Sequence, residues 1–272
     1  MIRLPIAIYP VQHSLLKTVI KYFWTIRSDE PFSIHHKLLP VGNCDILFNF
    51  SDPITYISKN TEQQFRRSHV IGIRHQSCFI RQTGRLDVLG IACFPAGLYP
   101  FLRIPLEELT DRIIEADIVF KTVMASLEDQ LAIAHHTTAR LAILERELLR
   151  RIEPQLLPPQ VISHAARQIR IANEPLNLLQ FCDVSGIHLR TLERMFARYI
   201  GIRPKLFHRF ARFQQAIGYL IRQPALTLTN IAHECEYYDQ AHFIKDFTAF
   251  AGCSPSQFLS ERRSVKEIAI LL

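Results

Sequence analysis

The spacing of apolar residues changes partway along the chain, and the change predicts two kinds of structure. In the first part the apolar residues come in short runs, Cys44–Phe50 and Leu86–Phe94, which Pro and Gly bound. Runs of this kind are typical of buried strands in a sheet or barrel. Further on, the apolar residues recur at the spacing of a helix, as they do at Leu127, Leu131 and Ala134. The pattern therefore predicts a strand-rich first part that ends in a helical pair.

A proline-rich stretch marks the boundary between two domains. Glu153–Gln160 contains three prolines. Because proline lacks a backbone N–H and has a fixed φ, a regular helix is not expected to continue through this stretch. We interpret residues 1–152 as a strand-rich domain with C-terminal helices, 153–160 as a linker and 161–272 as an all-helical module. The fold class predicted for the whole chain is α+β.

Beyond the linker, capping and stop signals predict a series of helices. The expected elements are a helix at Val161–Ala172, a short helix between Asn177 and Gly186, an amphipathic helix at Leu189–Tyr199, a long helix at Lys205–Ile221, a short helix capped by Thr227, a helix between Asp239 and Gly252, and a last turn at Ser256–Arg262. The order of short capped helix, tight turn and longer helix occurs twice. A helix-turn-helix has this form, and its second helix enters a major groove.

The second helix of each unit pairs an apolar face with a polar one. In the first, Leu192 and Phe196 face inward, and in the second Phe243, Phe247 and Phe250 form the buried stripe. Arginine suits guanine, glutamine suits adenine, and glutamate can accept a hydrogen bond from cytosine. The polar faces that we expect to meet DNA carry Arg190, Glu193 and Arg194 in the first unit and Gln240, Ala241, His242 and Lys245 in the second.

The excess of positive charge lies mainly in the helical module. Residues 160–272 hold 14 Lys and Arg against 9 Asp and Glu, whereas residues 1–159 hold 18 against 16. This asymmetry favours a polyanionic partner. On the long helix, Lys205 and Arg209 are suited to phosphate contacts, and ion pairs on the helix surface are an equally good interpretation.

The composition also predicts a compartment. Six cysteines include no Cys-x-x-Cys pair, as expected for reduced thiols. The longest uncharged run, Val88–Leu102, contains two prolines and is too short to cross a bilayer. The N-terminus has no apolar stretch of signal-peptide length. We therefore expect a cytoplasmic, nucleoid-associated protein that has no contact with a membrane.

Two segments of the helical module carry a resemblance to a known family. "LLQFCDVSGIHLRTLERMFARYIGIRPKLF" and "LTLTNIAHECEYYDQAHFIKDFTAFAGCSPSQF" resemble the DNA-binding module of the AraC/XylS family of bacterial transcription regulators, over about Val161–Arg263. The resemblance implies two helix-turn-helix units that insert recognition helices into successive major grooves. The chain departs from the family at two positions: Glu236 replaces the usual turn glycine of the second unit, and His188 replaces a Ser-type cap.

The first domain resembles the sensor-like domain of unassigned function that precedes this module in many family members. The segments that carry this resemblance are "LLPVGNCDILFNFSD" and "LDVLGIACFPAGLYPFLRIPLEELTDR". The resemblance implies a small cupin-like barrel that senses a ligand, forms a dimer, or does both. The leucine-rich stripe of Met124–Ile152 fits self-association or packing against the barrel equally well.

Candidate ligand-binding residues in this domain fall into two pairs. Asp45 and Asn49 share one face of a strand, and Arg74 and Arg81 could together bind an acidic ligand. The alternatives are a buried hydrogen-bond network for the first pair and solvated charge for the second. Adjacent histidines at 35 and 36 would point to opposite faces of a strand, so we expect no metal site, and we predict no cofactor.

The function that these predictions favour is sequence-specific regulation of transcription through promoter DNA, controlled by a signal or ligand at the first domain. The family usually implies activation by contact with RNA polymerase, and repression stays open, as does a homodimer. We predict that the chain is not an enzyme and has no catalytic residue. The alternative is a cupin-type metalloenzyme tethered to a DNA-binding module.

Overall fold

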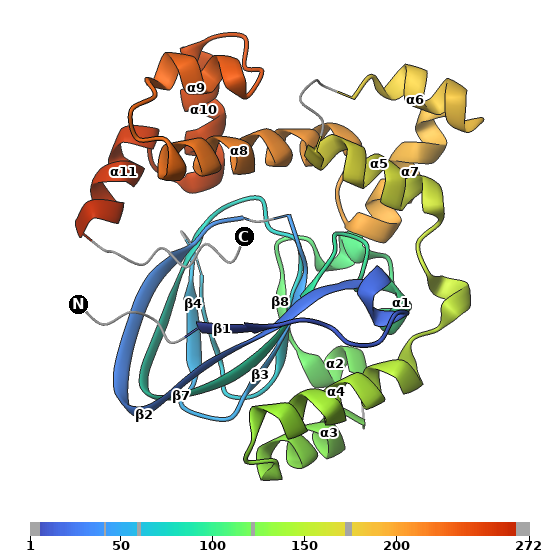
Figure 1. The fold of residues 1–272 in the computed structure, drawn as a ribbon, viewed down its shortest axis with the longest axis vertical. Coiled ribbons are helices and arrows are strands. Elements are labelled where there is room, and N and C mark those ends of the chain that lie inside the picture. Colours follow the sequence, from blue (N-terminus) through green and yellow to red (C-terminus); the bar gives the residue numbers. More distant parts are fainter. Residues whose placement is uncertain (1–5, 41, 59–60, 121–122, 172–175, 265–272) are drawn as a thin grey trace.

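The computed structural model describes residues 6–40, 42–58, 61–120, 123–171 and 176–264. Strands occupy the lower part of the molecule in Figure 1 and the C-terminal helices lie across the top. This arrangement confirms the predicted α+β class, in which a strand-rich domain precedes a helical module. A single buried core cluster contains residues of both, so the module is packed onto the sheet domain.

The first domain is built on an eight-stranded antiparallel sheet. Its strands follow the order β1–β2–β7–β3–β6–β8, with β4 paired to β7 and β5 paired to β4. The bounds are β1 Ile6–Tyr9, β2 Ile20–Leu38, β3 Asp45–Asn49, β4 Ile54–Ile57, β5 Glu62–Phe65, β6 His69–Ile71, β7 Cys78–Cys93 and β8 Ile113–Glu115. The long strands β2 and β7 run side by side, and their register shifts between Ser28 and Phe32. Such irregularities bend strands, and Figure 1 shows both strands curving around the sheet's interior.

The two faces of this curled sheet have separate apolar clusters. Because side chains alternate along a strand, Leu47 points to the inner cluster while Ile46 and Phe48 point to the larger core outside. The indole of Trp24 lies in the inner cluster opposite Gly90, its partner in the register of β2 and β7. A methyl group added at Gly90 would overlap that indole, so the strand pairing leaves room for the ring only because the partner is glycine.

Among the described residues, seven helices precede the module, some of them between strands of the sheet and the rest after its last strand. They are η1 Leu16–Thr18, α1 Tyr99–Leu102, η2 Leu106–Leu109, α2 Ala116–Phe120, α3 Val123–Ile133, α4 Thr137–Arg151 and η3 Pro154–Leu156. The predicted helical pair corresponds to α3 and α4, below the sheet in Figure 1. Buried Arg140 of α4 pairs with Asp87 of β7, with Nη1 and Nη2 lying 2.5 and 3.0 Å from the two carboxylate oxygens. Across the described part of the chain, every helix is too short or too polar to traverse a bilayer.

The module contains the helices that the sequence predicts. They are α5 Gln160–Ile171, α6 Leu178–Ser185, α7 Leu189–Ile200, α8 Pro204–Arg222, α9 Leu228–Glu234, α10 Gln240–Ala251 and α11 Pro255–Ser264. The predicted end of the first helix, Ala172, lies outside the described residues. In Figure 1, α8 runs between a unit made of α6 and α7 and a unit made of α9 and α10.

Three predicted side-chain caps begin helices of these units. The Asn177 Oδ1 atom accepts hydrogen bonds from the backbone N–H groups of Leu179 and Gln180, at 3.1 and 3.2 Å. Thr227 and Asp239 cap α9 and α10 in the same way. A cap of this type is worth about 1 kcal/mol of helix stability. His188 makes no such bond at the start of α7, in keeping with its departure from a Ser-type cap.

The turn between α9 and α10 contains a left-handed residue that is not glycine. Glu236 has φ +56°. The backbone carbonyl of Glu236 accepts a hydrogen bond from Arg212 Nη1 at 3.1 Å, and the next N–H, of Tyr237, bonds the Ala232 carbonyl at 2.9 Å. These bonds hold the turn in a left-handed geometry without glycine. The chain therefore keeps the turn at the cost of backbone strain.

Replacing Glu236 by Gly is expected to raise the free energy of unfolding by about 1 kcal/mol. The left-handed conformation costs an ordinary residue roughly 1–2 kcal/mol, and glycine loses roughly 0.5–1 kcal/mol through its greater freedom when unfolded. Urea denaturation followed by circular dichroism measures the difference.

The matched control is Glu236→Ala, which removes the same carboxylate but keeps a Cβ atom at positive φ. This variant should gain no stability. Equal stabilisation by both substitutions would assign the effect to the charge and contradict the backbone explanation.

Candidate nucleic-acid interface

The polar face of α7 lies opposite a fully buried stripe. Leu192 and Phe196 have no exposed surface, whereas Arg190 and Arg194 are exposed and Glu193 is half-buried. The periodicity of a helix requires this separation, because residues three and four apart share a face. The three residues predicted to read bases in the first unit therefore lie together on the outer side of α7.

The second unit repeats this arrangement on α10. Its buried stripe is aromatic, and the ring of Phe247 lies 5.1 Å from Phe213 of α8 and 5.6 Å from Phe258 of α11. The four predicted base-reading positions follow on the other side: Gln240, Ala241 and Lys245 are exposed and His242 is half-buried. Gln240 is already engaged, since its Oε1 accepts a hydrogen bond of 2.7 Å from Thr229 of α9. Its amide N–H groups are then the donors that it offers to a ligand.

Arg209 differs from the other predicted DNA contacts. Its Nη2 and Nε lie 2.7 and 3.2 Å from the Asp246 carboxylate, and its guanidinium lies over the ring of Phe250. Arg212 also approaches Asp246, at 3.6 Å. The hydrogen bond to Asp246 raises the pKa of Arg209. Of the two interpretations that the sequence left open, Arg209 therefore forms the ion pair, and it joins α8 to α10.

Asp246 is a functional position that sequence reasoning missed. Its side chain is 6% exposed and lies among the aromatic residues of α10. The signal was present in the sequence, because Asp246 is three residues after Phe243 and four before Phe250, on the inward face. A carboxylate at an inward position needs a buried partner, and α8 provides two arginines.

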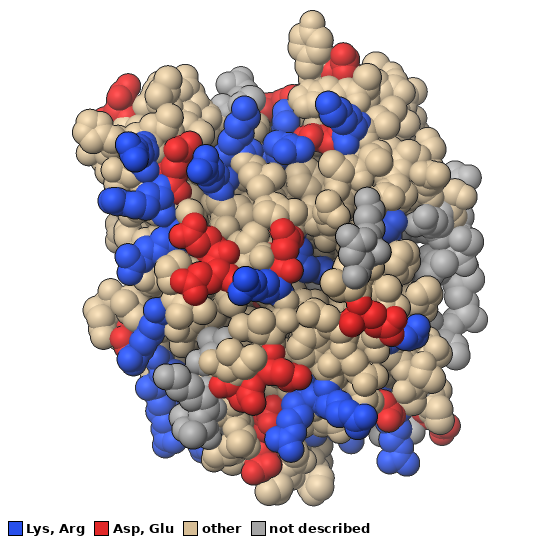
Figure 2. All heavy atoms as spheres, turned by 180° about the vertical axis from the view of Figure 1, so that it is seen from behind, with Lys and Arg blue, Asp and Glu red and all other residues tan. Residues whose placement is uncertain are grey.

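The predicted DNA contacts also include Arg190, Arg194, Lys205 and Lys245. Within the described residues, none of these four side chains forms an ion pair. Figure 2 shows Lys and Arg side chains across the upper part of one face, over the module, with acidic patches among them toward the middle. Cations without protein partners are available for phosphates or base edges.

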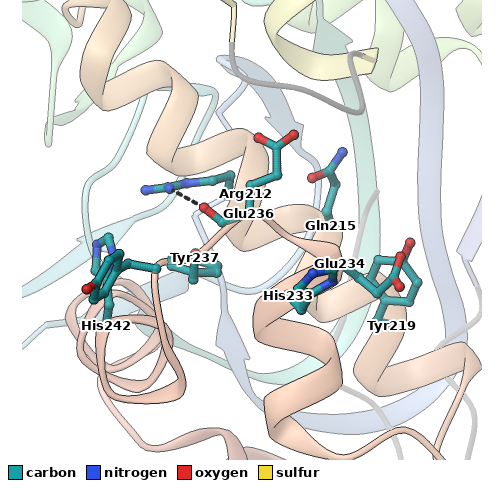
Figure 3. Close-up of a pocket in the computed structure, with 9 residues that line it drawn as sticks. Arg212, Gln215, Tyr219, His233, Glu234, Glu236, Tyr237 and His242 are labelled. Atoms are coloured by element: carbon teal, nitrogen blue, oxygen red, sulfur yellow. Dashed lines mark hydrogen bonds between the residues drawn. The ribbon is translucent and has the colours of Figure 1, made fainter.

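A groove of about 800 Å³ lies beside the turn of the second unit, as Figure 3 shows. Glu236, Tyr237 and His242 line it from the turn and α10, and Arg212 lines it from α8. Tyr238 also lines the groove and is 92% exposed. Sequence reasoning gave Tyr238 no role, although it is an aromatic residue placed next to a base-reading helix. Its exposed ring adds an apolar, hydrogen-bonding group to this surface.

The ends of α7 and α10 are both bonded to the first domain. At the end of α7, the Gly201 carbonyl accepts a hydrogen bond of 2.7 Å from Thr110 Oγ1. At the end of α10, the Phe250 and Ala251 carbonyls accept bonds of 2.9 and 2.8 Å from the backbone N–H and Oγ of Ser77. These carbonyls have no partner within a helix, so the first domain satisfies them. The same domain thereby holds both units.

The structure separates the four predicted ligand-binding residues. Asp45 and Arg74 line one hollow inside the curled sheet. Asn49 instead forms a buried network, in which its Nδ2 donates to the Asp52 carbonyl at 3.0 Å and to the Arg66 carbonyl at 3.3 Å. Arg81 is exposed and pairs with Glu62 at 2.6 Å. Arg74 and Arg81 therefore do not meet across one hollow.

The adjacent histidines of β2 point to opposite faces, as the strand geometry predicts. His36 is buried inside the sheet, whereas His35 is exposed and stacks on Phe79. In the described ranges, no three His, Cys, Asp or Glu side chains gather as metal ligands would.

Two family models match separate parts of the chain. Residues 12–115 match a domain of unknown function (DUF6597), and residues 181–261 match a helix-turn-helix domain. The first match covers the curled sheet, and the second covers both units and α8. The boundary between the matched regions contains the proline-rich stretch.

Two curated proteins are each similar to about a third of the chain. An uncharacterized HTH-type transcriptional regulator of Haemophilus influenzae is 32% identical over 100 residues, which are 36% of this chain and 32% of that protein. The HTH-type transcriptional activator RhaR of Escherichia coli K12 is 31% identical over 84 residues, 31% of this chain and 29% of RhaR. The chain thus spans about a third of the length of these curated relatives.

Among the solved structures of similar proteins, one aligns with most of the chain and another with less than half of it. ToxT from Vibrio cholerae aligns with 86% of this chain and 98% of its own, at 11% identity and a TM-score of 0.46. A probable AraC family transcriptional regulator from Rhodopseudomonas palustris covers 38% of this chain and 97% of its own, at 24% identity and a TM-score of 0.35. Residues 181–261 are therefore an AraC-type helix-turn-helix domain, and it follows a strand-rich domain.

Proposed function

We propose that the chain is a transcription regulator that binds double-stranded promoter DNA through residues 161–272. The observation that carries the proposal is the pair of outward polar faces on α7 and α10, each backed by a buried stripe, on units at either end of α8. In this proposal the first unit reads bases through Arg190, Glu193 and Arg194. Arginine and glutamate there can form bidentate and acceptor contacts in a major groove.

The second unit makes a different kind of contact. Ala241 presents only a methyl group, and the Gln240 carbonyl is already bonded to Thr229. We therefore assign this unit mainly to positioning on the duplex: Lys245, with Lys205 at the start of α8, neutralises phosphates. Phosphate contacts fix register, whereas base contacts specify sequence.

Residues 1–152 act as the sensor or dimerisation domain in this proposal, and 153–160 connect them to the module. The bonds from Thr110 and Ser77 to the ends of α7 and α10 support control of both units by this domain. A ligand changes the outcome only if it binds two arrangements of the domains with different affinity.

A relative named an activator supports activation of transcription. We extend the proposal to contact with RNA polymerase and to action at the nucleoid. The function requires no catalysis. The alternative, a tethered metalloenzyme, would need a cluster of metal ligands. Stoichiometric zinc, iron or nickel in the purified protein would support this alternative.

Arg194→Ala is expected to weaken binding to a selected duplex by about 1–3 kcal/mol and to relax the preference at one base pair. Selection from random duplexes, followed by fluorescence anisotropy with single-base variants, measures both effects. The control is Arg81→Ala, which removes an exposed arginine from the sheet domain and should leave affinity unchanged. Undiminished discrimination at every position would show that the outer face of α7 does not read DNA.

Lys245→Ala is expected to lower affinity for all duplexes alike and to reduce the slope of log affinity against log salt by about one. Titrations over a series of salt concentrations give the slope. Lys245→Arg keeps the charge and should preserve it. A loss of affinity confined to one base pair would make Lys245 a base-reading residue and contradict the assignment.

A further inference from the structure

A hollow of about 80 Å³ lies inside the curled sheet, between β2, β3 and β7. Apolar side chains form most of its wall, among them Ile26, Leu47 and Ile71. A cavity needs roughly 10–15 Å³ to hold one water molecule. The hollow therefore has room for a molecule of a few heavy atoms with a short apolar part.

Two polar atoms on this wall are buried without a hydrogen-bond partner in the part of the chain that the structure describes. They are the indole N–H of Trp24, whose side chain is 4% exposed, and Oδ1 of Asn43, which is 6% exposed. Leaving such a group unsatisfied costs about 1–3 kcal/mol. The first is a donor and the second an acceptor, so an occupant that satisfies both must carry an acceptor and a donor.

Charged groups complete the wall at one end. Arg74 lines the hollow and donates one hydrogen bond, to Cys78 Sγ, which leaves further guanidinium N–H groups for an occupant. Asp45 faces the same space, and burial raises the pKa of its carboxyl to about 7, against the opposing charges of Arg74 and Lys21. A carboxyl with a pKa raised in this way is partly protonated near neutral pH, and its protonated form does not repel an anion and can itself donate a hydrogen bond.

Arg74 and Tyr56 also line a second hollow of about 440 Å³ on the side of the segment that joins β6 to β7. Ser58, Gln63 and Ser77 are among its polar lining residues. The Arg74 and Tyr56 side chains therefore border both hollows.

We propose that the inner hollow binds a short-chain hydroxy acid. Arg74 and the Trp24 N–H bind its carboxylate, Asn43 Oδ1 accepts from its hydroxyl, and the apolar wall covers its carbon chain. One small molecule that carries both functional groups can satisfy the unpartnered donor and the unpartnered acceptor together, because both residues line the same hollow. The inference rests on the proposed function only in giving this molecule a regulatory role.

The site also has a direct connection to the module. Arg74 is three residues before Ser77, whose backbone N–H and Oγ hold the end of α10. His75, one of the two residues between them, stacks its ring on Phe210 of α8, with the ring centroids 6.2 Å apart. An anion bound by Arg74 therefore acts on a segment that already touches both helices.

The experiment uses the purified full chain without DNA, so its result is independent of the proposed DNA binding. Trp24 is the only tryptophan in the sequence, and its fluorescence reports on the hollow directly. Glycolate and lactate are the probes. Propionate lacks the hydroxyl and propane-1,2-diol lacks the carboxylate. Saturable changes with glycolate or lactate, and binding of propionate and the diol that is weaker by about tenfold or more, are expected.

Variants test the assigned contacts. Arg74→Gln should weaken binding of the hydroxy acid by about tenfold or more, and Arg81→Gln, on the outer face, should leave it unchanged. Asn43→Ala should weaken lactate binding but not propionate binding, which identifies the hydroxyl contact even if Arg74→Gln fails to fold. Either of two results overturns the proposal: no saturable response to glycolate or lactate, or equal binding by the wild type and a folded Arg74→Gln variant.

Discussion

The aromatic stripe of α10 is the constraint on which the second DNA-facing surface depends. Phe243, Phe247 and Phe250 are almost completely buried against α8 and α11. Burying a ring of this size contributes about 1.5–3 kcal/mol, so rotation of α10 about its axis would expose three rings at once. The helix therefore has one stable orientation, and its polar residues are outward because the rest of its surface is committed to packing.

Electrostatics strengthens the same orientation. The inward carboxylate of Asp246 draws Arg209 and Arg212 from α8 toward α10. Removing one partner of a buried pair leaves an uncompensated charge, so the three residues form a single unit of structure. Arg209 and Arg212 of α8 therefore serve in packing, whereas Lys205 of the same helix lies at the surface. The net charge of the module could not have predicted which of these basic residues is paired.

The module could be predicted from its sequence to a large extent because its signals are local. Asn177, Thr227 and Asp239 cap helices as their positions indicate. The missing glycine marked the turn at Glu236 as unusual, and the structure shows that Glu236 adopts the left-handed conformation there. The first domain is less predictable because its site depends on pairing between distant strands. The alternation along β3 placed Asp45 correctly on the inner face, but Trp24, Asn43 and Arg74 meet only through the register of β2, β3 and β7. For the same reason Arg81 could not be separated from Arg74 before the sheet was known.

The hydrogen bonds from Thr110 and Ser77 fix more than the position of the module. They anchor α7 and α10 to one sheet domain, so the gap between these helices has two determinants, α8 and that domain. A duplex whose grooves do not match this gap has to curve, and the energy of curvature depends on base steps that no side chain touches. In the proposed regulator, the gap that the sheet domain helps to set between α7 and α10 therefore favours DNA that bends easily between the two contacted grooves.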